Sequence, residues 1–259
     1  MPTANAAGAA SGMAALAIAA NGTYPARRGL TTREMLKIQW DYAVAANESV
    51  QTEGTAVKAG RSALPVEEAF KRLAGNDPRP LLVVRECQVC NKTDNALLKP
   101  GVDNERTIVL SRWFHCVKLP VDVVDPSEPF NAIFPTNDAE HLFVASNDGS
   151  HRIPLESDTS RPELWDAMAK VLGKSYARDP NSAAKDILKI HDRLDILDQK
   201  LVELEKSRDD LVENPGRMDK ERLKKLDKEI ATAKKELDDQ RKSIEKLSKI
   251  DLKSPEKKA

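Results

Sequence analysis

The chain has no excess of charge of either sign, because 41 Lys and Arg residues are balanced by 41 Asp and Glu residues over 259 positions. Proteins that bind nucleic acid usually show a basic imbalance, so nucleic acid is a poor candidate for the principal partner. The sequence also lacks an apolar run near the roughly 18 residues that a membrane-spanning helix requires. We therefore expect no membrane span and a partner other than nucleic acid.

Cysteine is scarce as well. Three cysteines in 259 residues cannot form the dense disulfide scaffold of small secreted proteins. We expect a cytoplasmic protein, while an extracytoplasmic location stays open because the Ala- and Gly-rich residues 4–20 weakly resemble the apolar centre of a signal peptide. No Lys or Arg precedes that stretch, so we interpret residues 1–30 as a disordered N-terminus.

The middle of the chain alternates short helical and strand-like patterns. Thr31 with Glu34 fits a capping box and favours a helix from about 32 to 46, so that residues 31–62 are read as a helix and a polar linker. The further predicted elements are a helix over 65–75, strands over 81–85 and 114–119, a β-hairpin over 141–155 and a helix over 160–172 that ends at Gly173. This order predicts an α/β domain over residues 63–175.

The most specific motif is the pair Cys87 and Cys90, which directly follows the apolar strand 81–85. A thiol between a strand and a helix N-terminus is favoured as a thiolate by the helix dipole and by free backbone N–H groups. Cys87 is therefore the expected nucleophile. Cys90, one helical turn later, is placed to resolve a mixed disulfide.

Zinc binding is an alternative for the same cysteines. Cys87, Cys90, His115 and Cys116 supply the ligand types of a Cys3His zinc site. His115 and Cys116 are adjacent, however, and in a strand adjacent side chains point to opposite faces. We therefore expect neither a metal nor another cofactor, and we expect Cys116 to be a buried apolar residue.

The order of these elements and the position of the two cysteines resemble the thioredoxin-like superfamily over about residues 63–173. The resemblance implies a mixed four-stranded sheet flanked by helices. It also implies thiol–disulfide exchange with Cys87 as nucleophile and Cys90 as resolver. Pro135 is the best candidate for the proline that faces the reactive cysteine in that family.

Several features depart from the family pattern. Gln88-Val89 stand between the cysteines where thioredoxins have Gly-Pro, and residues 136–140 separate Pro135 from the strand at His141. Leu81 stands six residues before Cys87, where thioredoxins have a buried Asp that aids proton transfer. Glu86 precedes Cys87 in place of the family's Trp. A carboxylate beside the thiol raises its pKa and so opposes the helix dipole.

The C-terminal third follows a heptad-like pattern, which Asn214-Pro215-Gly216 interrupts. Pro and Gly disfavour a continuous helix there, so residues 182–250 are predicted to form an antiparallel coiled-coil hairpin, followed by a disordered tail over 251–259. Arg208 and Gln240 occupy seam positions, and His191 is expected on the solvated face. The predicted apolar seam consists of Ile187, Ile190, Leu194, Leu197, Leu201, Leu204 and Leu211, and of Leu223, Leu226, Ile230, Ala233, Leu237, Ile244 and Leu247.

These patterns support two functional hypotheses. In the first, the chain is a thiol–disulfide oxidoreductase or redox sensor that acts on a disulfide of a partner protein, and the coiled coil attaches it to that partner or pairs two copies as a homodimer. In the second, the α/β domain is a non-enzymatic platform and the hairpin binds another protein. The sequence alone does not decide whether the chain is an enzyme.

Overall fold

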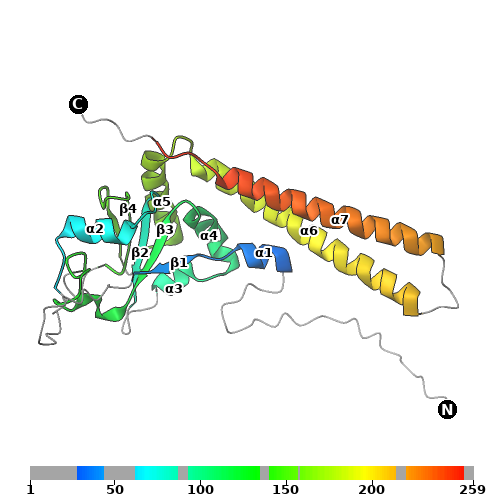
Figure 1. The fold of residues 1–259 in the computed structure, drawn as a ribbon, viewed down its shortest axis with the longest axis horizontal. Coiled ribbons are helices and arrows are strands. Elements are labelled where there is room, and N and C mark those ends of the chain that lie inside the picture. Colours follow the sequence, from blue (N-terminus) through cyan, green and yellow to red (C-terminus); the bar gives the residue numbers. More distant parts are fainter. Residues whose placement is uncertain are drawn as a thin grey trace, which may run out of the picture.

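The computed structural model describes residues 28–43, 62–86, 93–134, 140–156, 158–213 and 220–253. A five-stranded mixed sheet with flanking helices forms one end of the molecule (Figure 1). Two long helices, α6 (Pro180–Glu213) and α7 (Lys220–Ser248), extend from it side by side. This arrangement confirms the predicted α/β domain and the predicted helical hairpin.

The sheet has the strand order β1-β3-β2-β4-β5. Strands β1, β3 and β2 are mutually parallel, whereas β4 is antiparallel to β2 and β5 is antiparallel to β4. All five residues of the central strand β2 are buried, as expected for a strand that is covered on both faces. The strands are β1 (Trp40–Tyr42), β2 (Leu81–Arg85), β3 (His115–Leu119), β4 (Leu142–Ala145) and β5 (Ile153–Leu155).

The expectation of four strands and of a helix over 32–46 was wrong. Helix α1 (Leu30–Met35) is only six residues long, and Trp40–Tyr42 form the additional edge strand β1. Trp40 pairs with Cys116, and Tyr42 pairs with Lys118. Pairing with β3 and the β-propensity of the two aromatic residues therefore outweigh the helical pattern.

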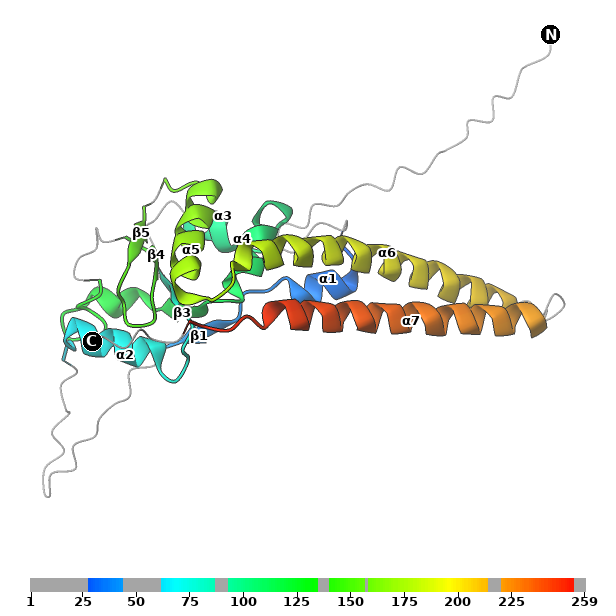
Figure 2. The ribbon, with the colours of Figure 1, turned by 90° about the horizontal axis from the view of Figure 1, so that it is seen from above.

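Helices cover both faces of the sheet (Figure 2). On one face, Leu82, Val84 and Cys116 pack against α3 (Thr93–Leu98), α4 (Glu105–Ser111), α5 (Arg161–Ser175) and the first half of α6. The other face packs against α2 (Val66–Ala74) and the 3-10 helix η2 (Val121–Val124). A second 3-10 helix, η1 (Val102–Asn104), precedes α4. None of the helices in these described segments is long and apolar enough to span a membrane.

Helix α5 begins at Arg161, close to the predicted residue 160. Ser160 and Glu163 bond reciprocally there in a capping box. The helix does not end at Gly173 but continues to Ser175. Tyr176 then forms a β-bridge with Leu252, beyond the end of α7. The pairing of these two chain segments fixes where α5 ends, and the glycine does not.

The predicted turn of the hairpin β4–β5 is also present. Ser146 N–H donates to Ser150 O at 2.8 Å, and Gly149 N–H donates to Ser146 O at 2.9 Å. Gly149 has φ +81°, and a Cβ atom on it would lie 2.4 Å from Cδ2 of Phe70. Both the backbone angle and the close approach of α2 therefore require glycine at this position.

Replacing Gly149 with Ala is expected to lower the free energy of unfolding by about 2 kcal/mol, because it combines a strained positive φ with a clash against Phe70. Urea unfolding followed by circular dichroism measures this change. Gly173→Ala is the matched control, because its new Cβ meets nothing within 4 Å on an exposed helical turn. That control should be neutral or stabilising by up to about 1 kcal/mol. Equal effects of the two substitutions would contradict the assignment.

The two long helices pair along the predicted seam. Arg208 Nε lies 2.8 Å from Asp227 Oδ1 across the helix pair, so this seam arginine has a carboxylate partner. Lys234 and Glu205 form a second ion pair between the helices at 2.9 Å. The predicted turn at Asn214-Pro215-Gly216 lies outside the described residues. Of the terminus over 1–30 that was predicted to be disordered, residues 1–27 lie outside them, and Leu30 begins α1. Of the tail over 251–259 that was predicted to be disordered, residues 254–259 lie outside them, and Leu252 pairs with Tyr176.

The prediction that His191 is solvated was wrong, because the proximal part of α6 has partners besides α7. The His191 side chain is fully buried, and its carbonyl oxygen accepts a hydrogen bond from Thr32 Oγ1 at 3.2 Å. Helices α1 and α4 both pack on α6 at this level. A heptad pattern shows only the contact between α6 and α7 and does not show these further helices.

Carboxylates of α6 hold the segment that enters α1. Arg28 binds Asp192 at 2.7 Å and Asp195 at 2.6 Å, and it also binds Glu105 of α4 at 2.5 Å. Thr31 donates from its backbone N–H and its hydroxyl to Asp198, at 2.9 and 2.8 Å. The N-terminal segment, α4 and α6 are thus joined by one polar cluster.

Candidate functional site

The predicted site residues Cys87, Cys90 and Pro135 lie outside the described part of the chain. Their neighbours in sequence are described. Glu86 follows β2, Thr93 opens α3, and Phe134 and Glu140 stand on either side of the segment that contains Pro135. The C-x-x-C motif therefore belongs to the connection between the carboxyl end of β2 and α3.

Arg85, the last residue of β2, brings the two flanking regions together. Its backbone N–H donates to His141 O at 2.7 Å, and its Nη2 lies 2.8 Å from His141 Nδ1. Its guanidinium carbon lies 5.8 Å from the centroid of the Phe134 ring. Phe134 and His141 bracket the segment that holds Pro135, so this segment starts and ends at the same edge of the sheet from which the chain leads to Cys87.

Arg85 is only 2% exposed, which is unusual for an arginine. Burial lowers the pKa of its guanidinium from the ordinary 12.5, and the charge of Glu140 opposes that change. An arginine keeps its proton at neutral pH even so. A buried cation therefore lies at the carboxyl end of β2.

Two ion pairs lie near Arg85 among the described residues. Lys118 Nζ lies 2.6 Å from Glu86 Oε1. Arg152 forms an ion pair with Glu140, and its guanidinium carbon lies 4.3 Å from the centroid of the Phe143 ring. Each of these two ion pairs is neutral.

Sequence reasoning missed Arg85 and His141 as members of this site. The only signal for Arg85 is an arginine that closes a run of four apolar residues, Leu81–Val84. His141 lies 56 positions further along the chain, and no local pattern connects the two residues. Their contact depends on the antiparallel pairing of β2 with β4.

His115 and Cys116, the other ligands of the zinc alternative, point to opposite faces of β3. Cys116 packs in the core with α4, and its Sγ lies 3.6 Å from Ser111 O. His115 Nε2 instead lies 3.2 Å from Asp41 Oδ2 of β1. A single ion cannot use both side chains, and the described residues contain no cluster of three metal-binding side chains.

Cys116 is expected to resist alkylation in the native protein, because burial raises the pKa of its thiol to about 12 and the core excludes the reagent. Peptide mapping after treatment with iodoacetamide at pH 8 should show labelling at Cys116 only when urea unfolds the chain. The Cys116→Ser variant identifies the peptide. Labelling of Cys116 ahead of Cys87 in the folded protein would contradict both the burial and the choice of Cys87 as nucleophile.

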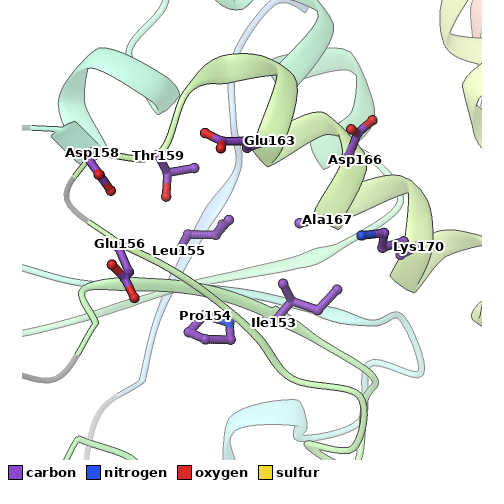
Figure 3. A pocket seen from close by; sticks show the side chains of 10 residues that line it. All are labelled: Ile153, Pro154, Leu155, Glu156, Asp158, Thr159, Glu163, Asp166, Ala167 and Lys170. Carbon is purple, nitrogen blue, oxygen red and sulfur yellow. The ribbon is translucent and has the colours of Figure 1, made fainter.

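A separate groove lies between β5 and α5 (Figure 3). It has a volume of about 420 Å³, with Leu155 and Ala167 among its apolar lining. Four carboxylates line it, and Lys170 is the only basic residue among its lining residues: the acidic residues are Glu156, Asp158, Glu163 and Asp166. Strand β4 separates this groove from β2 in the strand order of the sheet.

No protein-family model matches this chain, and no curated protein or solved structure matches it. The functional argument therefore depends on the C-x-x-C motif, on the strand order around it and on the charges at the carboxyl end of β2.

Proposed function

We propose that the sheet and its flanking helices form a thioredoxin-like domain and that the chain is a thiol–disulfide oxidoreductase. The observation that carries this proposal is the position of the C-x-x-C motif in the sequence, one residue after the carboxyl end of the central strand β2. The order of elements behind the family resemblance also recurs, as α2, β2, a helical connection, β3, the hairpin β4–β5 and α5.

In the proposed reaction, the Cys87 thiolate attacks one sulfur of a disulfide in a partner protein. A mixed disulfide forms, and the partner's other sulfur leaves as a thiolate and takes up a proton. The Cys90 thiolate then attacks Cys87, which releases the partner's second sulfur and closes the Cys87–Cys90 disulfide. The partner gains two electrons and two protons, and the C-x-x-C pair loses them. The reverse reaction uses the same steps.

Pro135 is proposed to face Cys87, as its counterpart does in the family. Phe134 and His141, which lie on either side of its segment, both contact Arg85 at the end of β2 and support this placement. In this role the proline segment would hold the extended backbone of the partner beside the thiol.

Isotopic alkylation tests the proposal on the full chain. Free thiols are blocked after oxidation by oxidised glutathione, the protein is reduced, and new thiols are labelled with a heavy reagent. Cys87 and Cys90 should both carry the heavy label, and Cys116 should not. Cys90→Ser should accumulate a mixed disulfide at Cys87, whereas Cys87→Ser should form none. A Cys87–Cys90 pair that stays reduced throughout the glutathione titration would refute the oxidoreductase.

A non-enzymatic role for the hairpin is the second candidate, and one observation favours it. Helices α6 and α7 extend well beyond the sheet domain (Figures 1 and 2), and α6 exposes the apolar side chains Ile196, Val202 and Val212. Helical surfaces of this kind bind partner helices or a second copy of the same chain. Light scattering of the purified chain distinguishes a homodimer from a monomer whose hairpin binds a different protein.

A further inference from the structure

We propose that the distal part of the helical hairpin, residues 198–213 of α6 and 220–235 of α7, is the surface through which two copies of this chain form a two-fold symmetric dimer. This inference rests on the second candidate function, in which the hairpin binds a protein, and it names that protein as a second copy. It does not depend on the redox reaction.

Close to the sheet domain, helix α1 covers one side of the α6–α7 pair (Figure 2). The Thr31 hydroxyl of α1 donates to Asp198 Oδ1 of α6 at 2.8 Å, and Arg241 Nη2 of α7 lies 3.8 Å from Glu34 Oε2 of α1. The seam residue Leu197, at the level of these contacts, is only 5% exposed. A third helix thus contributes to the burial of the seam here.

Further along the hairpin, the described segments place no third helix on this pair, which extends away from the rest of the molecule (Figures 1 and 2). The seam residues of this distal part are only half-buried: Leu201, Leu204, Leu211, Leu223 and Leu226. Two helices alone cover a seam from one side, whereas a bundle of four covers it from both. The distal seam therefore lacks the cover that α1 gives to the proximal one.

Exposed valines extend the distal seam along one flank of α6. His191, Asp195 and Asp198, at spacings of four and three, form the flank that α1 and the residue before it contact. The same alternation of spacings continues to Val202 and Val212, which are 66% and 48% exposed. The open surface is thus continuous with the one that α1 already occupies.

The two helices carry opposite net charge in this region. Residues 198–213 contain six acidic and three basic residues, and residues 220–235 contain seven basic and three acidic residues. The two helices already attract each other within one copy, where Lys234 Nζ lies 2.9 Å from Glu205 Oε1.

This charge distribution favours a second copy as the partner. In a two-fold pair of hairpins, α6 of one copy lies beside α7 of its partner, so that acidic and basic helices alternate around a four-helix bundle. A single helix of one charge sign in the same groove would lie beside a helix of its own sign, which is unfavourable. A second copy is therefore complementary in charge to both helices.

The size of the surface sets the expected strength of the dimer. About 16 residues of each helix span roughly 24 Å, and two adjacent helices are about 20 Å wide, so each copy contributes roughly 500 Å². A total of about 1,000 Å² is at the low end of specific interfaces. We therefore expect a dissociation constant on the order of 10 μM.

Sedimentation velocity of the full chain between 1 and 200 μM, with a reductant that excludes disulfide-linked dimers, tests the proposal. The chain should change from monomer to dimer over this range. Raising KCl from 50 to 500 mM should weaken the dimer at least about threefold, because salt screens exposed charges.

The matched variants differ in the face of α6 that they alter. Val202→Ser combined with Val212→Ser should raise the dissociation constant at least about tenfold, because two apolar side chains are lost from the interface. Ile196→Ser is the control: this residue is 67% exposed but does not belong to the flank that continues from α1. It should change the dissociation constant by less than about twofold. Circular dichroism checks that each variant keeps its helices.

Charge reversal tests the pairing of α6 with α7 of the partner. Glu205→Lys with Asp209→Lys makes α6 basic in one variant, and Lys224→Glu with Lys234→Glu makes α7 acidic in a second variant. Each variant alone should dimerise weakly. A mixture of the two should form a heterodimer at least about tenfold more tightly than either homodimer, because opposite charges again meet across the interface.

Each possible outcome bears on the proposal. A chain that remains monomeric at 200 μM would refute the dimer and leave the hairpin to a different protein. A dimer that is insensitive to the valine changes, or equally weakened by Ile196→Ser, would place the interface elsewhere and refute the assigned surface. Failure of the Cys87–Cys90 pair to cycle would refute the oxidoreductase and leave the dimer unaffected.

Discussion

Acidification from pH 6.5 to pH 4 is expected to remove about 3 kcal/mol from the free energy of unfolding through His191 alone. Burial lowers the pKa of this histidine from 6.5 to about 4, and the charges of Arg112 and Arg28 add to the effect. Asp195 and Asp192 oppose it. The side chain is fully buried, and neither ring nitrogen has a hydrogen-bond partner within the described residues.

The sign of this change in stability with pH follows from the number of protons that each state binds. Between pH 6.5 and pH 4 the unfolded chain carries a proton on His191, and the folded chain does not. The unfolded state therefore binds more protons, and stability falls as the pH falls. Below about pH 4 both states are protonated, and the contribution becomes constant. Above pH 6.5 neither state is protonated, so the full stability is retained.

Urea unfolding of His191→Leu between pH 4 and pH 7 measures this contribution. The variant should lose about 3 kcal/mol less than the original protein over this range. It should be at least as stable at pH 7, because leucine leaves no unpaired nitrogen in the core. The control is His151→Asn, which alters an exposed histidine in the turn of β4–β5. An unchanged acid dependence in His191→Leu would contradict the assignment.

Elements with long and strongly periodic sequences could be predicted without the structure. The heptad pattern predicted the helical hairpin, and the apolar runs predicted β2 and β3. Strand β1 could not be predicted, because three residues carry no measurable period and its identity depends on pairing with residues 116–118. The burial of His191 was missed for a similar reason, since residues far away in sequence cover it.

Some residues of the candidate site could likewise be recognised from the sequence, and others could not. The cysteine motif is local and could be recognised from six consecutive residues, 85–90. The buried cation beside it could not, because arginine is normally an exposed residue and its partner His141 belongs to another strand.

The segments directly before α6 and directly after α7 join the hairpin to the sheet domain. Ala177 N–H donates to Asp251 O at 3.0 Å, and Lys253 N–H donates to Ser175 O at 2.9 Å. Trp113 Nε1 also donates to Ser248 O at 3.0 Å, which connects the end of α7 to the turn before β3. A partner bound to the hairpin would therefore be held in a defined orientation relative to the carboxyl end of β2. This connection makes the two candidate functions compatible.

Removal of the Arg28 side chain should lower the free energy of unfolding about as much as acidification does. Arg28→Met leaves the carboxylates of Glu105 and Asp195 without their cation, although their side chains are only 8% and 17% exposed. Breaking a buried ion pair from one side costs roughly 3–5 kcal/mol, and partial contact with water reduces this to about 3 kcal/mol here. The mutual stabilisation is also visible in Arg28, whose pKa is raised chiefly by its hydrogen bonds to Glu105.

A double-mutant cycle with Glu105→Gln separates the ion pair from general damage to the interface. The double variant should be about 2 kcal/mol more stable than the sum of the single changes predicts, because the neutral amide no longer needs a cation. Lys189→Met, which removes an exposed pair with Asp186, should cost less than about 0.5 kcal/mol. Strictly additive effects at positions 28 and 105 would mean that the segment before α1 is held by its backbone contacts to Asp195 and Asp198, and that the Arg28–Glu105 pair contributes little to stability.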